Sequence, residues 1–284
     1  MIRTSRRQFI FAGGAVALLA ACGSDAAKPP AAGLDAVAPR LTNGPLLVPG
    51  ESRLAISLVD PNQTLLLTGP ATLTAKIVDA EGKQVVAGLS APIHADGIPQ
   101  AYWPFRFTIE QPGFYQLLVD GTDPVSGYFG VFNTNQVTMP YIGSTLEPFD
   151  TPTVADHRGV EPYCSLTPNP CPLHEVTLTD ALQSGKPVVY MVGTPAHCQT
   201  GACAPALQFL VATHQRLADK VTMVHADVYA DNAGTQFAPA VDALGLDYEP
   251  VIYFVKADGT IIDRLDGIWD QSEVDQRVDA LIAA

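Results

Sequence analysis

Basic residues are scarce in this chain. Its 284 residues include 16 lysines and arginines against 29 aspartates and glutamates, for a formal net charge of −13 at pH 7. An acidic surface argues against nucleic acid as a partner, because phosphate groups are bound by clustered lysine and arginine side chains. It also argues against attachment to a membrane through anionic lipid headgroups, which attract basic segments.

Two other features are missing. No heptad pattern or internal repeat is present, and after the first 22 residues no apolar run is long enough to span a bilayer. A chain of this length without such features predicts a folded body of two domains. We therefore expect any membrane attachment to come from the N-terminal segment.

Residues 1–22 are predicted to be a targeting segment. Three arginines near the N-terminus are followed by an apolar stretch, residues 9–21. This stretch is too short to remain as a membrane-spanning helix. Residues 5–10, Ser-Arg-Arg-Gln-Phe-Ile, resemble a twin-arginine export signal, and residues 19–22, Leu-Ala-Ala-Cys, resemble a bacterial lipobox. The resemblance implies that Cys22 carries lipid and anchors the protein at the extracytoplasmic face of the cell membrane.

Composition divides the rest of the chain into four segments. Residues 23–45 are rich in alanine, glycine and proline, which predicts a flexible tether. Residues 46–133 hold six short β-rich runs separated by turn residues, which predict an antiparallel β-sandwich. Residues 134–172 form a proline-rich connector, and residues 173–284 alternate between strands and helices.

The sandwich has a sequence signature of its own. Residues 105–119 form a strand, a Pro-Gly turn and a second strand that begins with aromatic side chains, and they resemble the late strands of bacterial immunoglobulin-like domains. The six expected strands are 53–59, 71–78, 84–86, 105–109, 115–119 and 128–132. Trp103 is expected in the core, and His94 is expected to be solvated or structural rather than a ligand.

Two cysteines lie between a buried strand and a helix. Residues 187–192 are an apolar, β-branched run, which is typical of a strand buried on both faces. Cys198 and Cys203 follow it, and apolar side chains then recur at helical spacing over residues 205–218. A thiol at the start of a helix lies near unpaired N–H groups, which stabilise the reactive thiolate.

This segment resembles the thioredoxin superfamily, and the resemblance extends over residues 173–284. Tyr248-Glu249-Pro250 and the strand after it are similar to the superfamily's cis-proline strand, and a hairpin and a final helix follow. The resemblance implies an α/β fold with a central mixed sheet flanked by helices. Within it we expect a helix at 179–184, a helix that holds Pro205 in its first turn and runs to 218, a helix at 235–244, a strand at 220–228, and a terminal helix from Asp270 with Glu273 completing a capping box.

The resemblance also implies an activity, that of a thiol–disulfide oxidoreductase acting on exported proteins with thiols or disulfides. Cys198 would attack, Cys203 would resolve the mixed disulfide, Pro250 would shape the partner groove and His197 would tune the thiol. Thiol–disulfide exchange needs no cofactor, and we expect none.

The four-residue spacer between the two cysteines departs from the two-residue spacer usual in the superfamily, and Glu249 would oppose a thiolate at Cys198. Both features favour an alternative, in which the domain is a non-catalytic binding or scaffold module and the two cysteines form a structural disulfide. The cysteine pair followed by a proline also resembles the Sco-type copper proteins, although no histidine follows His225. A peroxidase, suggested by Thr194-Pro195 ahead of Cys198, is a further alternative.

Cys164 and Cys171 in the connector are the other cysteine pair. Once Cys22 carries lipid, four cysteines remain, and an even number in an oxidising compartment favours disulfides over a zinc site. We therefore favour a local disulfide that closes a short loop, with a resolving role toward Cys198 as the sharper alternative. A metal site is a third, less favoured interpretation, and its candidate ligands are His157, Cys164, Cys171, His174 and His197.

Overall fold

The computed structural model describes residues 36–39, 46–60, 62, 64–122, 127–198 and 200–284. The predicted signal segment, Cys22 and most of the predicted tether lie outside these residues. Among the described residues, no helix has both the length and the apolar character needed to cross a bilayer. The two structural parts described next belong to one compact unit.

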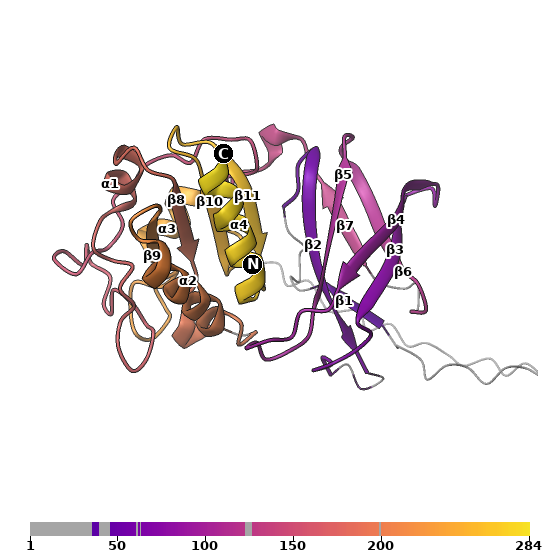
Figure 1. The fold of residues 1–284 in the computed structure, drawn as a ribbon, viewed down its shortest axis with the longest axis horizontal. Helices are drawn as coiled ribbons and strands as arrows, with labels where there is room; N and C mark the ends of the chain where they lie inside the picture. Colours follow the sequence, from indigo (N-terminus) through magenta and orange to yellow (C-terminus); the bar gives the residue numbers. More distant parts are fainter. Residues whose placement is uncertain (1–35, 40–45, 61, 63, 123–126, 199) are drawn as a thin grey trace, which may run out of the picture. The chain divides into compact units, whose positions relative to one another are not determined.

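The first part consists of two antiparallel sheets (Figure 1). One sheet has the order β1-β2-β5 and the other has the order β4-β3-β6-β7. The strands are β1 (Ala36–Pro39), β2 (Gly50–Val59), β3 (Thr72–Asp79), β4 (Gln84–Pro92), β5 (Trp103–Ile109), β6 (Gly113–Val119) and β7 (Tyr128–Val131). All six expected strands are present, whereas the specific immunoglobulin-like assignment stays a prediction.

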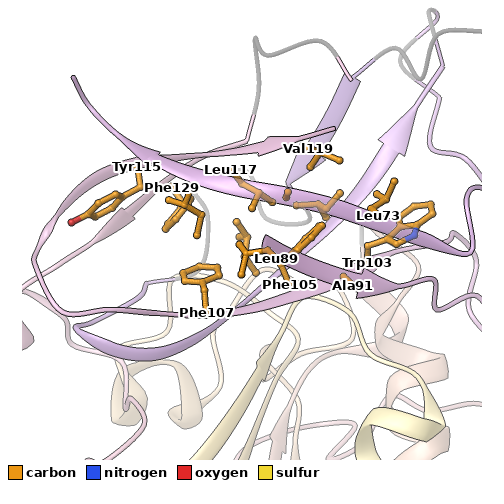
Figure 2. Packing of buried hydrophobic residues seen from close by; sticks show 14 of the residues in the cluster. Leu73, Leu89, Ala91, Trp103, Phe105, Phe107, Tyr115, Leu117, Val119 and Phe129 are labelled. Carbon is orange, nitrogen blue, oxygen red and sulfur yellow. The ribbon is translucent and has the colours of Figure 1, made fainter. Parts of the chain in front are cut away.

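A single hydrophobic core lies between these two sheets, and Figure 2 shows its packing. Alternate residues of β5 point into it, including Trp103 and Phe105, because successive side chains of a strand face opposite sides. Trp103 is fully buried, as expected, and its indole N–H donates to the carbonyl of Pro70. Aromatic rings fill the other end, where Phe107 and Tyr115 both contact Phe129.

The second part is built on a mixed four-stranded sheet of order β11-β10-β8-β9. Its elements are α1 (Leu178–Gln183), β8 (Val188–Val192), α2 (Cys203–Leu217), β9 (Thr222–Ala226), α3 (Pro239–Leu244), β10 (Val251–Val255), β11 (Ile261–Asp266) and α4 (Gln271–Ala283). Strands β8 and β9 are parallel, and β10 is antiparallel to both of its neighbours. This order, with a cysteine pair between β8 and α2, confirms the predicted thioredoxin-like fold.

Helices cover both faces of this sheet. Val189 and Met191 of β8 pack in one cluster with α2 and α4, whereas Val188, Tyr190 and Val192 pack in another with α1 and α3. All five residues of β8 are therefore buried, as the uninterrupted apolar run predicted. The carboxyl end of β8 is thus held rigidly from both sides.

Three expectations about local structure need correction. Residues 36–39 of the predicted tether form the edge strand β1 on β2, because the edge of β2 offers unpaired backbone N–H and C=O groups to another segment. The helix expected at 235–244 begins only at Pro239. A proline disfavours helical backbone in the residue before it, and Ala238 is accordingly extended. Asp270 does cap α4, but the side chain of Glu273 turns to Arg53 instead of completing a capping box.

Strand β2 is buried on both faces, and its second face carries Arg53. The Arg53 guanidinium donates to both carboxylate oxygens of Glu273 in α4 and to the carbonyls of Asp266 and Ile268. Tyr102 donates its hydroxyl to the same carboxylate at 2.6 Å. Arg53 and Glu273 are each only 3% exposed, so this ion pair links the two parts in a medium of low polarity.

The Arg53–Glu273 pair predicts a large stability effect. Arg53→Met leaves the Glu273 carboxylate buried without its charge partner, and we expect the free energy of unfolding to fall by about 3–5 kcal/mol. The double variant Arg53→Met/Glu273→Leu removes both charges, and it should be more stable than the single variant. Urea unfolding of the three proteins measures both differences.

The matched control is Arg216→Met, which breaks the exposed ion pair between Arg216 and Asp275. An exposed pair contributes about 1 kcal/mol or less, so this variant should unfold close to the wild type. Equal losses in Arg53→Met and Arg216→Met would show that the Arg53 pair is not buried in solution.

Candidate redox site

Cys198 and Cys203 form a disulfide at the junction of β8 and α2. Their Cα atoms are 5.9 Å apart, within the usual range for a disulfide, so the four-residue spacer does not keep the sulfurs apart. The short 3₁₀-helix η2 (Pro195–His197) precedes Cys198, and Cys203 is the first residue of α2. Proline at position 205 fits in the first helical turn, as predicted.

The two sulfurs differ in exposure and in their surroundings. Cys198 is partly exposed, whereas Cys203 is fully buried. The backbone N–H of Cys203 donates to the Sγ of Cys198 at 3.1 Å, and the hydroxyl of Thr200 lies 3.4 Å from the same sulfur. These groups and the N-terminus of α2 favour negative charge on Cys198, so the more accessible sulfur is also the better thiolate.

Glu249 lies beside the buried sulfur. Its Oε2 is 3.7 Å from the Sγ of Cys203 and accepts a hydrogen bond from the backbone N–H of Thr194. Burial raises the pKa of this carboxyl to about 7, and the bond from Thr194 offsets only part of that shift. The sequence suggested that Glu249 would oppose a thiolate at Cys198; the structure instead places it where it can exchange a proton with Cys203.

Pro250 and Gly193 approach each other closely near the disulfide. The Glu249–Pro250 peptide bond is cis, as the resemblance implies. A Cβ added to Gly193 would lie 3.1 Å from the Cβ of Pro250 and 3.4 Å from the Oε2 of Glu249. A glycine at the end of β8 is therefore what allows the Glu249–Pro250 segment to reach the redox pair.

His197 does not contact the redox sulfurs in the described structure. Its Nε2 lies 3.2 Å from the carbonyl of Asn232, and its ring packs edge-on against Tyr229. Tyr229 in turn stacks on Phe237, which is 66% exposed. His197 thus belongs to an aromatic surface next to Cys198, a better position for contacting a partner than for tuning the thiol.

The first part of the chain also reaches this site. A Cβ on Gly201, in the spacer between the cysteines, would lie 3.8 Å from Pro99 of the loop between β4 and β5. Ala202 packs in a small buried cluster with Tyr102 and Ile98. The spacer therefore rests on the sandwich, which explains how an unusually long loop between the cysteines is supported.

Cys164 and Cys171 are both buried, and they are free thiols. The predicted local disulfide is therefore not formed, and neither sulfur is joined to Cys198. Instead, both sulfurs face the rings of His174 and His225, which are completely buried. A hydrogen bond with Cys171, together with bonds to the two histidines, holds the pKa of the Cys164 thiol well below its usual range.

The proposed ligand set of the less favoured metal interpretation is only partly correct. Cys164, Cys171 and His174 do converge, whereas His157 pairs with Glu161 and His197 lies on the aromatic surface. His225 was missed, although its place in β9 offers a signal: it lies two residues after Met223 and shares its face of the sheet. Among the described residues, the Cys198–Cys203 pair belongs to no such cluster, and the Sco-type alternative stays a prediction.

No protein-family model and no curated protein matches the chain. Among solved structures, one assigned as thiol:disulfide interchange protein DsbE from Chlorobium tepidum covers 50% of this chain and 98% of its own, with 14% identity and a TM-score of 0.37. MTB dsbF covers 50% of this chain and 99% of its own, with 22% identity and a TM-score of 0.31. At these scores, the assignment of the fold rests on the strand order and the cysteine junction described above.

The raised pKa of Glu249 predicts a pH-dependent loss of stability. Between its unfolded value of 4.5 and its folded value of about 7, the folded protein holds a proton that the unfolded chain has released. Raising the pH through this window therefore favours unfolding, by about 3 kcal/mol for a shift of this size. Glu249→Gln cannot ionise, so its stability relative to the wild type should rise by that amount from about pH 4 to pH 8.

Urea unfolding of the oxidised protein across this pH range measures the difference. Glu81→Gln removes an exposed carboxylate and controls for the change in net charge. A difference between Glu249→Gln and the wild type that does not vary with pH would mean that burial does not shift the ionisation of Glu249.

Proposed function

We propose that this protein is an exported, membrane-anchored thiol–disulfide oxidoreductase that uses Cys198 and Cys203 as its redox pair. The observation that carries the proposal is the asymmetry of the pair. An accessible sulfur lies at a helix N-terminus, and a buried sulfur lies 3.7 Å from a carboxyl whose pKa is near neutrality. A disulfide that served only as a staple would need neither arrangement.

The geometry supports a two-step exchange. The thiolate of Cys198 attacks one sulfur of a partner disulfide; that S–S bond breaks, and the partner's other sulfur leaves as a thiolate that takes up a proton. The thiol of Cys203 then gives its proton to the carboxylate of Glu249, and the resulting thiolate attacks the Sγ of Cys198. The mixed disulfide breaks, the partner's sulfur leaves as a thiolate that takes up the proton held by Glu249, and the Cys198–Cys203 disulfide closes. The reverse sequence oxidises a dithiol partner.

The surroundings suggest how a partner would be held. Pro250 precedes the buried strand β10 and lies against Gly193, so it can border a groove beside Cys198, as the resemblance implies. The surface formed by His197, Tyr229 and Phe237 offers an aromatic flank, and His197 directly precedes Cys198 in sequence. The sandwich loop at Pro99 supports the spacer, which gives the first part of the chain a role in shaping the site.

Exchange activity predicts different outcomes for the two cysteines. Cys198→Ser should abolish the reduction of insulin, because the attacking thiolate is lost. Cys203→Ser should also lose turnover but accumulate a mixed disulfide between Cys198 and its partner, which non-reducing electrophoresis and mass spectrometry detect. Glu249→Gln should retain the first step and slow the release of the partner.

A redox titration with thiol alkylation separates this function from the alternative of a structural disulfide. Exchange enzymes titrate between about −120 and −270 mV, whereas structural disulfides lie below about −300 mV. If the pair stays closed until potentials below about −300 mV, the proposed activity is wrong, and the domain is better described as a binding module.

The membrane anchor is a separate part of the proposal and has its own test. We expect the full-length protein to sediment with membranes and to incorporate labelled fatty acid, whereas Cys22→Ala should do neither. Loss of twin-arginine export on changing Arg6 and Arg7 to Lys would support the proposed route. A Cys22→Ala variant that remains in the membrane fraction would contradict lipid anchoring at this residue.

A further inference from the structure

Four buried side chains that can bind a metal converge below the redox site: Cys164, Cys171, His174 and His225. Their ligand atoms all lie within 4.8 Å of one another. The Nε2 of His174 is 3.1 Å from the Nδ1 of His225, and that Nδ1 is 3.9 Å from the Sγ of Cys164 and 3.7 Å from the Sγ of Cys171. The other nitrogen of each ring, Nδ1 of His174 and Nε2 of His225, lies next to a backbone carbonyl.

These separations match the edges of a tetrahedron around zinc. Zinc binds histidine nitrogen at about 2.0–2.1 Å and cysteine sulfur at about 2.3 Å, so ideal ligands lie about 3.3 Å apart for two nitrogens and about 3.5 Å apart for nitrogen and sulfur. The observed distances of 3.1, 3.7 and 3.9 Å lie within a few tenths of an ångström of these values. Only small shifts would be needed to complete the coordination.

The hydrogen bonds of the two rings show which nitrogen of each ring carries the lone pair that could bind a cation. The Nε2 of His225 lies 2.8 Å from the carbonyl of Gly193, and the Nδ1 of His174 lies 3.3 Å from the carbonyl of Pro152. A carbonyl oxygen only accepts, so each of these nitrogens carries a hydrogen. The two nitrogens that face each other then carry lone pairs when both rings are neutral, and their 3.1 Å approach is repulsive unless something positive lies between them.

We propose that Cys164, Cys171, His174 and His225 form a structural Zn²⁺ site. On binding, the two thiols would release their protons, and two thiolates with one Zn²⁺ and two neutral imidazoles give a site with no net charge, which suits complete burial. The carbonyls of Gly193 and Pro152 would act as the outer partners that fix the orientation of each ligating ring. Asp227 lies alongside, with its Oδ1 3.6 Å from the Nε2 of His225.

The donor set favours zinc over other metals. Two cysteines and two histidines in a closed tetrahedral arrangement are typical of structural zinc, whereas a catalytic site keeps a position open for water. Cys164, Cys171, His174 and His225 are each no more than 3% exposed, so solvent has no open approach. Burial and coordination would also protect the two thiols from oxidation in an oxidising compartment.

The position of the site gives it a structural role. Cys164, Cys171 and His174 come from the irregular segment before α1, whereas His225 belongs to β9. The same segment contacts η2, just before Cys198, because the Oγ of Ser165 accepts from the backbone N–H of Ala196 at 3.3 Å. The backbone N–H of Ser165 donates to Asp227. Zinc would therefore fasten a stretch without regular structure to the sheet, next to the loop that carries Cys198.

The test is the metal content of the full-length protein, purified in detergent without chelators. We expect one zinc per chain by elemental analysis. In Cys171→Ser, we expect the zinc content per chain to fall by about tenfold or more. The double variant Cys198→Ser/Cys203→Ser is the matched control, since it also removes two sulfurs, and it should keep one zinc. Alkylation should label Cys164 and Cys171 only after zinc has been removed.

Cobalt exchange in the wild-type protein keeps the test valid if Cys171→Ser does not fold. Tetrahedral Co²⁺ with two thiolates gives intense visible bands and a thiolate-to-metal charge-transfer band, and we expect both. Three results would overturn the proposal: a metal-free protein with a Cys164–Cys171 disulfide, copper in place of zinc, or zinc that is lost from the Cys198→Ser/Cys203→Ser control. Since metal content is independent of insulin reduction, failure of the redox proposal would leave this outcome unaffected.

Discussion

The close approach at Gly193 is the constraint on which both sites depend. Its carbonyl accepts from the ring of His225, and the next backbone N–H, that of Thr194, donates to Glu249. A Cβ at this position would lie only 3.1 Å from the Cβ of Pro250, so that neighbour would have to shift. One peptide unit just after β8 therefore contacts both His225 of the cysteine–histidine cluster and Glu249 beside Cys203. Since β8 is packed on both faces, neither site can shift without disturbing this strand.

The second constraint is the burial of charge between the two parts of the chain. Strand β2 packs its apolar side chains into the sandwich core and directs Arg53 into α4, where Glu273 and two carbonyls satisfy the guanidinium. An ion pair in such surroundings is costly to leave half-formed, so it specifies one arrangement of β2 against α4 more than it adds stability. That arrangement also places Tyr102 against Ala202, and through it the sandwich supports the spacer between the redox cysteines.

The sequence predicted where Cys198, Cys203 and the cis-proline Pro250 lie in the fold, because a strand, two cysteines, a helix and a later proline are each visible as local patterns. It could not give the environment of Glu249, which depends on the depth of Cys203 in the fold. His225 was not placed beside Cys164 and Cys171 from the sequence, because these residues meet only when β9 joins the sheet. A disulfide between those two cysteines is the expectation that follows from their even number and the predicted export; His174 lies close to them in sequence, whereas His225, which completes the cluster, lies far along the chain in β9.

The four-residue spacer has a physical consequence for the exchange reaction. It places Cys203 as the first residue of α2, where its own N–H points at the Sγ of Cys198 and its sulfur is turned into the interior. A buried thiol cannot lose its proton to water, so it needs a base inside the protein. Glu249 is within reach, and burial gives it a pKa close to neutrality, where a carboxyl can both accept and release a proton. In the proposed exchange, the carboxylate that the sequence predicts to oppose a thiolate at Cys198 is thus the group that would accept the proton of the buried Cys203.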